Sequence, residues 1–369
     1  MLCWGGNGTI TNTEISNNSG GIGGGIKSPH PISLAGCTIS GNTASFLGGG
    51  GYFDGDATLV DCTISGNSAG SIGGGIDCSD ESSPALTNCT ISENSAEDGG
   101  GVSFRWDSTP TLTDCTISNN SAEYDGGGIF ALRDSHATLA NCSISNNSAQ
   151  VDGGGIWTSN SDLTLANCTI SENSAEDDGG GIWGWTSHPT LLNCTISKNA
   201  AYDNGGGIAN DGDATLINCM ISANWAEVDG GGIYNSDGHA TLRNCTISDN
   251  SSGSSGGGVY SFLNRWVTTT ATNTILWSNT PDQAVQLSAT YSNVEGGHPG
   301  EGNIGANPRF ISAHGFDYVL APKSPCIDAG TGANDGVDWS RIHRRYGVIN
   351  SEAPDMGAYG GPAAAGWLD

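Results

Sequence analysis

The sequence has 369 residues, 59 of them glycine, and its 11 basic and 38 acidic residues give a formal charge of −27. This charge argues against nucleic acid or anionic membranes as partners and favours cations. No stretch approaches the roughly 18 apolar residues of a membrane helix, so we expect no membrane insertion of this segment. We also recognise no export signal or anchor in it, and we expect it to be part of a longer protein.

A repeat of about 26 residues runs through most of the chain. Nine cysteines recur at spacings of 25 to 27 residues, and each is followed by isoleucine after two positions and by asparagine after five. A glycine triplet follows about 11 residues after each cysteine. A self-similar period of this length is the signature of a solenoid. The repeated cysteines are Cys37, Cys62, Cys89, Cys115, Cys142, Cys168, Cys194, Cys219 and Cys245.

Each repeat predicts short strands and no helix. Cys-Thr-Ile-Ser alternates inward and outward residues with the period of a strand, and Ala-Thr-Leu and Gly-Ile supply two more strands. Repeats stacked ~4.8 Å apart would form three short parallel sheets around a core of identical side chains. We therefore predict an all-β, right-handed parallel β-helix. Its regular coils would occupy residues 1–265, and irregular final coils with a capping region would occupy residues 266–369.

Three repeated residue types have structural explanations. Asparagine tolerates the left-handed backbone, and its amide can bond to the amide of the next coil. The glycine triplet fits a turn where side chains would clash. The cysteines face inward, where parallel stacking gives poor geometry for disulfides, and no histidine joins their column. We predict a column of buried thiols that act as small apolar groups.

An acidic column precedes the glycine triplets. Like charges one coil apart repel each other by about 1 kcal/mol per pair even in water. A cation with several oxygen ligands, Ca²⁺ above all, would offset this repulsion. The alternative is a solvated edge whose aspartates cap the glycine turn. The candidate calcium ligands are Asp98, Asp125, Asp152, Asp178 and Asp229, with Glu97, Glu123, Glu176 and Glu227 beside them.

An aromatic column follows the Gly-Gly-Gly-Ile segment. The strand period turns the isoleucine inward and the next residue outward, so the sequence predicts a row of exposed rings. Such a row is typical of sugar or partner binding, and the alternative is ring stacking that stabilises the sheet. The candidate ligand-binding residues are Phe130, Trp157, Trp183, Tyr234 and Tyr260.

Two more columns are open to two interpretations each. Alternating histidine and aspartate before the later cysteines could bind a transition metal or form an exposed ion-pair ladder. The outward Thr-x-Ser positions, such as Thr63 and Ser65, resemble the hydroxyl lattices of ice-binding proteins but also suit any exposed strand. The first of these columns contains His136, Asp162, His188, Asp213 and His239.

The C-terminal part carries more specific motifs. They are Asn273-Thr274-Ile275-Leu276-Trp277, Asn307-Pro308-Arg309-Phe310, Ser324-Pro325-Cys326-Ile327-Asp328-Ala329-Gly330 and Pro354-Asp355-Met356-Gly357. With these motifs the chain resembles the choice-of-anchor Q family, and its repeats are similar to those of polymorphic outer membrane proteins. The resemblance implies export and display on a bacterial surface, and it supplies no catalytic residue.

The predicted function is that of a secreted or cell-surface, structural or adhesive solenoid that binds carbohydrate and Ca²⁺. A glycan or cell-surface partner is expected, and flat coil ends would permit self-association. The main alternative is a polysaccharide lyase or glycosidase, although the basic residues are scattered and the acidic residues sit in equivalent environments. Ice binding and filament formation are further alternatives. We assign no catalytic residues.

Overall fold

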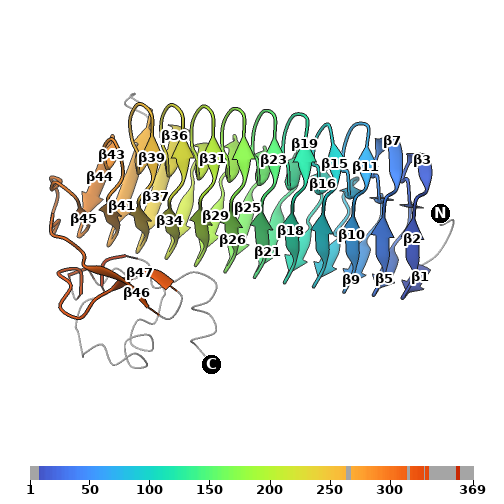
Figure 1. Cartoon of the computed structure of the whole chain (residues 1–369), viewed down its shortest axis with the longest axis horizontal. Helices are drawn as coiled ribbons and strands as arrows, with labels where there is room; N and C mark the ends of the chain where they lie inside the picture. Colours follow the sequence, from blue (N-terminus) through green and yellow to red (C-terminus); the bar gives the residue numbers. More distant parts are fainter. Residues whose placement is uncertain (1–7, 263–266, 314–315, 328, 332–354, 358–369) are drawn as a thin grey trace.

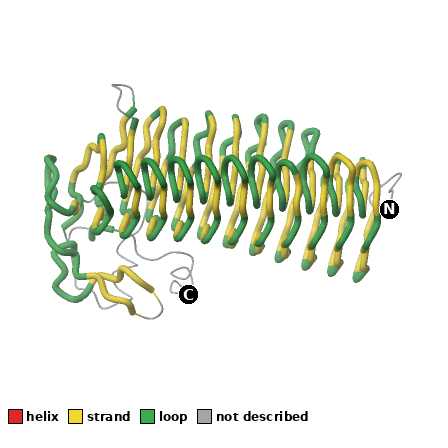
Figure 2. The backbone as a smooth tube through the Cα atoms, turned by 45° about the horizontal axis from the view of Figure 1, so that its top comes forward, coloured by secondary structure: helices red, strands yellow, loops and turns green. Residues whose placement is uncertain are grey.

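The computed structural model describes residues 8–262, 267–313, 316–327, 329–331 and 355–357. The chain winds into a long stack of coils, with the N-terminal coil at one end and the C-terminal strands at the other (Figure 1). All described regular structure is strand, and successive coils repeat the same outline (Figure 2). The predicted parallel β-helix is confirmed, and the structure adds a fourth sheet to the three that were expected.

The leucine sheet is formed by the Ala-Thr-Leu segments, whose leucines point into the core. Leu165, for example, is fully buried and pairs in register with Leu191 of the next coil. Its strands are β1 (Gly8–Thr11), β5 (Ile32–Ala35), β9 (Ala57–Val60), β13 (Ala85–Thr87), β17 (Thr111–Thr113), β21 (Ala137–Ala140), β25 (Leu163–Ala166), β29 (Thr190–Leu192), β33 (Thr215–Ile217), β37 (His239–Arg243), β41 (Thr268–Thr272) and β44 (Leu287–Thr290).

The isoleucine sheet is formed by the Thr-Ile-Ser segments that follow the cysteines. The isoleucines are buried, whereas the threonines and serines face outward. Its strands are β2 (Glu14–Ser16), β6 (Thr38–Ser40), β10 (Thr63–Ser65), β14 (Thr90–Ser92), β18 (Thr116–Ser118), β22 (Ser143–Ser145), β26 (Thr169–Ser171), β30 (Thr195–Ser197), β34 (Met220–Ser222), β38 (Thr246–Ser248), β42 (Ile275–Trp277) and β45 (Asn293–Val294).

The serine sheet is the one that the sequence did not predict. A dipeptide after the buried asparagine, Ser-Ala in most coils, is too short to show a period, yet it pairs in register from coil to coil. Its strands are β3 (Ser19–Ile22), β7 (Thr43–Leu47), β11 (Ser68–Ala69), β15 (Ser95–Ala96), β19 (Ser121–Ala122), β23 (Ser148–Ala149), β27 (Ser174–Ala175), β31 (Ala200–Ala201), β35 (Trp225–Ala226) and β39 (Ser251–Ser252).

The aromatic sheet follows the glycine triplets. In each strand of this sheet the first residue points into the core and the second points outward, as the strand period requires. Its strands are β4 (Ile26–Ser28), β8 (Gly51–Phe53), β12 (Ile76–Cys78), β16 (Val102–Arg105), β20 (Ile129–Leu132), β24 (Ile156–Ser159), β28 (Ile182–Trp185), β32 (Ile208–Asp211), β36 (Ile233–Asp237), β40 (Val259–Ser261) and β43 (Ala284–Val285).

A buried asparagine ladder joins the coils between the isoleucine and serine sheets. The side-chain amide of Asn147 donates to the carbonyl oxygen of Ile117 and to Oδ1 of Asn173, each at 3.0 Å. The predicted amide stacking is therefore confirmed. The left-handed conformation, however, is adopted by neighbouring residues such as Asn146 and Asn141 and not by the ladder asparagines, because the tight turns lie on either side of the strand.

The cysteines form the predicted column of buried free thiols. The Sγ atom of Cys142 donates to the carbonyl oxygen of Ala140 at 3.3 Å, so each thiol has a local backbone partner. Burial raises the pKa of Cys219 well above its ordinary value. The described cysteines are buried and form no disulfide with one another, as expected of small apolar core residues.

The C-terminal region lies against the isoleucine sheet near its C-terminal end. The short hairpin of β46 (Phe310–Ala313) and β47 (Phe316–Leu320) extends below the last coils in Figure 1. Ile275 packs with Cys326 and Met356, and this contact buries Thr246, whereas its equivalent Thr63 is exposed. The parallel ladders continue to β45, and the predicted boundary at residue 265 falls outside the described residues.

Candidate functional site

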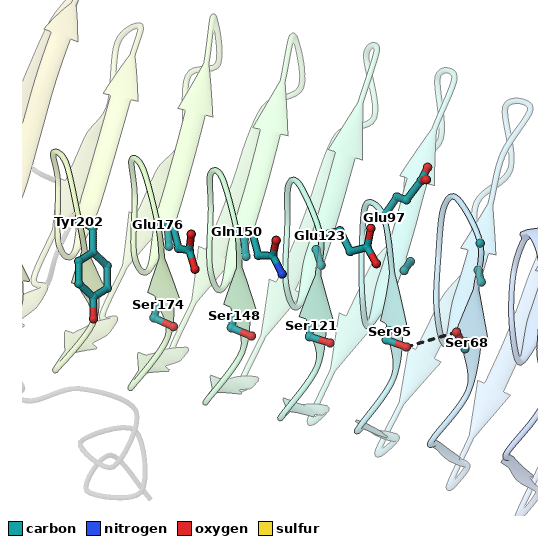
Figure 3. Close-up of a pocket in the computed structure, with 16 residues that line it drawn as sticks. Ser68, Ser95, Glu97, Ser121, Glu123, Ser148, Gln150, Ser174, Glu176 and Tyr202 are labelled. Carbon is teal, nitrogen blue, oxygen red and sulfur yellow. Dashed lines mark hydrogen bonds between the residues drawn. The ribbon is translucent and has the colours of Figure 1, made fainter.

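A groove of about 700 Å³ runs along the outer face of the serine sheet. We call it the serine groove. Its serines come from equivalent positions of successive coils, so their hydroxyl groups form one straight row (Figure 3). The hydroxyl of Ser95 donates to that of Ser68 at 3.3 Å, which fixes one pair in the row. The row consists of Ser68, Ser95, Ser121, Ser148 and Ser174.

A second row of side chains forms the wall of the serine groove. It contains Glu97, Glu123, Gln150 and Glu176, which follow the groove serines by two residues. Figure 3 shows the last three just above the serine row, whereas the carboxylate of Glu97 points away from it. Among the described residues, these glutamates have no ion-pair or hydrogen-bond partner for their carboxylates. The groove therefore offers hydroxyl groups on one side and uncompensated negative charge on the other. Glu227, the fourth predicted glutamate, is outside the groove lining.

Two exposed aromatic residues stand where both rows end. Tyr202 takes the position of the wall glutamates and lines the groove, and Trp225 takes the position of the serines one coil further on. Their rings contact edge to face, with centroids 5.4 Å apart and planes at 83°. Tyr202 remains 55% exposed and Trp225 38% exposed. Exposed ring faces beside a polar groove are suited to stacking on a sugar ring.

The predicted calcium aspartates form a different structure, which we call the aspartate ladder. Oδ1 of Asp152 accepts the backbone N–H of Asp178 at 2.9 Å, and Oδ1 of Asp125 accepts that of Asp152 at 3.1 Å. Asn204 continues the same ladder, since its Oδ1 accepts the backbone N–H of Asp229 at 3.2 Å. At this turn, an aspartate carboxylate takes the place of a backbone carbonyl oxygen as the acceptor for an N–H group of the next coil. This arrangement agrees with the structural interpretation of the aspartates.

The pKa values of the ladder aspartates are raised. Burial is the largest cause, the donated N–H groups oppose it, and neighbouring carboxylates add to it for Asp125 and Asp152. The pKa is about 6 for Asp125 and Asp178 and about 7 for Asp152. Because these values exceed the unfolded value of about 3.9, the folded state binds more protons than the unfolded state over this range.

We expect the protein to be more stable at pH 5 than at pH 8. The contribution of the ladder is complete below about pH 4 and is lost as the pH rises through about 6 to 7, where the carboxylates ionise in the fold. The measurement is thermal unfolding by circular dichroism across this range. The triple substitution D125N/D152N/D178N should raise the midpoint at pH 8 and flatten the pH profile, because Asn204 shows that asparagine fits the ladder.

The matched control for the ladder is D80N/D107N/D134N, which removes the same charge from exposed turn residues. If this control flattened the pH profile as much as the ladder variant, net charge and not the ladder would cause the effect. Calcium binding by the aspartates and by Glu97, Glu123, Glu176 and Glu227 stays a prediction. No group of three or more His, Cys, Asp or Glu side chains within the described part of the chain is arranged to hold a metal ion.

The predicted aromatic row is present, but the assumption that its rings are exposed is wrong for two members. Phe130 and Trp157 are only 4% and 6% exposed, and their rings stack at a centroid distance of 4.6 Å. The glycine turn packs closely against the base of the Trp157 side chain, since a Cβ on Gly153 would lie 2.7 Å from Cβ of Trp157. Tyr234 and Tyr260 also stack, at 5.4 Å.

Ligand binding stays a prediction for the half-buried members of this row, Trp183, Tyr234 and Tyr260. Burial and the negative charge of Asp178 raise the pKa of Tyr234 to about 12, which indicates that this ring lies near the aspartate ladder. The stacking alternative therefore accounts for much of the row.

The histidine–aspartate column also forms a ladder to the backbone. Nδ1 of His136 accepts the backbone N–H of Asp162 at 3.1 Å, and Oδ1 of Asp162 accepts that of His188 at 2.9 Å. His136 and Asp162 form one loose pair at 4.0 Å. The expected ion-pair ladder is therefore replaced by hydrogen bonds from backbone N–H groups to these side chains, and transition-metal binding stays a prediction.

One buried charged cluster interrupts the outward columns of the aromatic sheet. Nη2 of Arg105 lies 2.5 Å from Oδ2 of Asp77, and Ser103 donates a short hydrogen bond to the same carboxylate. Asp77 is fully buried and Arg105 is 9% exposed. In an enzyme built on this fold, catalytic residues would interrupt the repeated columns in this way. A polymer, however, cannot reach the atoms of this cluster without local opening of the structure.

The comparisons with known proteins agree with this architecture. The family model described as "Right handed beta helix region" matches residues 2–122, 55–184 and 127–296. The chain belongs to the right-handed β-helix family. The predicted handedness is thereby confirmed, whereas membership of the choice-of-anchor Q family stays a prediction. A search of curated proteins gave no significant match.

One solved structure that is similar to this β-helix is the crystal structure of the pectate lyase Pel9A. It is 12% identical to this β-helix, with a TM-score of 0.48, over 91% of this chain and 88% of that chain. The lyase activity in its name is a property of that protein.

Within the described residues of this β-helix, no helix has the length and apolar character needed to cross a membrane.

Sequence reasoning missed the end of the serine groove. Tyr202 and Trp225 do not form a column of their own, so a search for repeated residues passes over them. The available signal was their place in other columns, since each replaces a small or acidic side chain in adjacent coils of the β-helix. A residue that breaks a ladder at the surface was therefore more informative than a residue that continues one.

Proposed function

We propose that this β-helix is an extracellular or cell-surface protein that binds an extended polysaccharide in the serine groove. The observation that carries the proposal is the coincidence of a long polar groove with the exposed Tyr202–Trp225 pair at its end. An extended polymer suits a site that repeats at every coil, whereas a small ligand would need a single enclosed pocket.

The chemistry of the groove matches that of a sugar chain. Serine hydroxyl groups both donate and accept hydrogen bonds, as sugar hydroxyls do, and the wall carboxylates accept further hydrogen bonds. The apolar face of a sugar ring can stack on Tyr202 or Trp225. These contacts are individually weak in water, so affinity would come from their repetition along the chain.

Binding is favoured over catalysis by the uniformity of the groove. A glycosidase needs two carboxyl groups in different environments, one of which is protonated. Glu97, Glu123 and Glu176 occupy equivalent positions, and the groove lining contains no lysine, arginine or histidine to serve as a base. A polysaccharide-degrading activity is the alternative, and the buried Asp77–Arg105 cluster does not support it because a polymer cannot reach these side chains.

The test is binding to a panel of soluble polysaccharides by affinity electrophoresis and calorimetry. For any glycan that binds, the double variant Y202A/W225A should lose at least about tenfold in affinity, because buried aromatic contacts are strong contributors to interfaces. The control is Y124A, which removes an exposed ring outside the groove lining. Equal losses in both variants would contradict the assignment. Release of new reducing or unsaturated ends during incubation would favour the enzyme instead.

A further inference from the structure

We propose that the polysaccharide bound in the serine groove carries amino groups, so that protonated amines of an amino-sugar polymer face the glutamate wall. This inference rests on the proposed function and adds the chemical class of the ligand. It concerns the wall of the groove, whereas the proposed function depends on the serine row and the aromatic pair.

The first support is the unsatisfied charge in the groove. Glu97, Glu123 and Glu176 have no cationic partner among the described residues, although Lys198 pairs with Glu172 elsewhere on the surface at 3.6 Å. Glu97 and Glu123 occupy adjacent coils, ~4.8 Å apart in a parallel stack, so their carboxylates repel each other. The neutral Gln150 separates Glu123 from Glu176. A ligand with positive charges along its length would relieve this repulsion and would give each of the three carboxylates a partner.

The second support is what the groove excludes. A chain with a formal charge of −27 repels uronate and sulfated polymers, and the groove lining holds no basic residue that could attract them locally. A neutral glycan would leave the carboxylates of the wall without a cationic partner. An amine-bearing glycan combines hydroxyl groups for the serines with cations for the glutamates.

The third support separates a sugar polymer from a basic peptide. The groove ends at Tyr202, against which Trp225 packs, and both rings keep exposed surface. Flat ring surfaces suit the apolar faces of sugars, and the serine row suits repeated hydroxyl groups. A lysine-rich peptide would use the wall but would gain little from the serines.

The experiment compares two polymers with the same backbone, chitosan and a highly N-acetylated, soluble chitin derivative, at pH 5.5. Chitosan should bind at least about tenfold more tightly and should weaken as salt rises, because ion pairs in water are screened. The triple variant E97Q/E123Q/E176Q should lose about tenfold in affinity for chitosan and little for the acetylated polymer, as expected of three exposed ion pairs. Gln150 shows that glutamine is accommodated in this row.

The matched control is E14Q/E81Q/E93Q, which changes the net charge equally at exposed positions outside the groove lining. Equal losses of chitosan affinity in both triple variants would overturn the inference, because overall charge would then explain the binding. Circular dichroism melting of both variants verifies that each remains folded.

Other outcomes separate the two proposals. If both polymers bound equally and Y202A/W225A abolished binding, the amine inference would fail and the glycan groove would stand. Binding of polygalacturonate only with Ca²⁺ would also overturn the amine inference, since a cation would then bridge two acidic surfaces. Polylysine binding as tightly as chitosan, without any effect of Y202A/W225A, would reject a sugar ligand. If no glycan bound under any condition, the proposed function itself would fail.

Discussion

Replacing Gly154 by alanine is expected to destabilise the β-helix by about 3 kcal/mol or more, the cost of an overpacked site that cannot relax. Gly154 is the middle glycine of its triplet. A Cβ atom there would collide with the carbonyl group of Ser174 and would lie 2.6 Å from the carbonyl oxygen of Gly180. Both obstacles are backbone atoms of the next coil, so relief would require the coils to separate and lose their ladder bonds.

The matched control for this substitution is Gly21→Ala in β3, where a Cβ would meet no heavy atom within 4 Å. Urea unfolding followed by circular dichroism should show a much lower midpoint for G154A than for G21A. Limited proteolysis should locate new cleavage near residues 154–180, because a solenoid opens where the contact between coils fails. Similar midpoints for the two variants would show that the triplet is not required for coil stacking.

Replacing Asn147 by alanine is expected to cost about 3–5 kcal/mol, because it leaves several buried polar groups without partners. Oδ1 of Asn147 accepts the backbone N–H and the side-chain amide of Asn120, at 3.0 and 2.9 Å. Its Nδ2 donates to the carbonyl oxygen of Ile117 and to Asn173. No water can replace these contacts easily, since the side chain is 1% exposed.

Two comparisons isolate the hydrogen bonds of Asn147. Ser145→Ala in the same coil removes a small outward side chain and should change the unfolding midpoint little. Asn147→Asp keeps the shape but removes the donor, so it should also be strongly destabilising at neutral pH. A mild effect of both Asn147 substitutions would mean that the asparagine ladder contributes little to the stability of the fold.

Much of the fold could be predicted because one rule governs it. Identical side chains stack in register, so the period of the cysteines and isoleucines fixed both the solenoid and its inward columns, as Cys168 and Ile170 illustrate. The serine sheet was not predictable in the same way. A two-residue strand such as Ser174–Ala175 shows no alternation, and its pairing depends on the turns around it.

The surface was harder to predict because facing outward does not determine exposure. Trp157 faces outward as expected, yet its ring stacks on Phe130 and is buried. Asp152 belongs to the expected acidic column, yet its carboxylate accepts a backbone N–H and does not simply face solvent. Asp77 and Arg105 are 28 residues apart and occupy different column positions, so nothing in the period predicted that they would pair.

The glutamates of the acidic column, unlike the aspartates, remain accessible in the structure. Glu97, Glu123 and Glu176 were assigned together with the aspartates as one cation site, but the structure separates the two sets. The aspartates stabilise the turn, while these glutamates line the groove. A difference of one or two residues in position within a coil therefore separates a structural carboxylate from an accessible one, which sequence spacing alone does not reveal.

The most direct test of polysaccharide binding in the serine groove is the labelling of an introduced cysteine, because the native thiols are buried. All cysteines in the described residues are buried, so in a Cys3→Ser background an exposed cysteine introduced by S148C or T90C should react selectively with a maleimide. Ser148 lies in the groove, whereas Thr90 lies on the exposed face of the isoleucine sheet. Saturating polysaccharide should slow the labelling of S148C severalfold and leave T90C unchanged. Unchanged labelling of S148C by a polymer that demonstrably binds, or slower labelling of T90C, would place the ligand elsewhere and contradict the account.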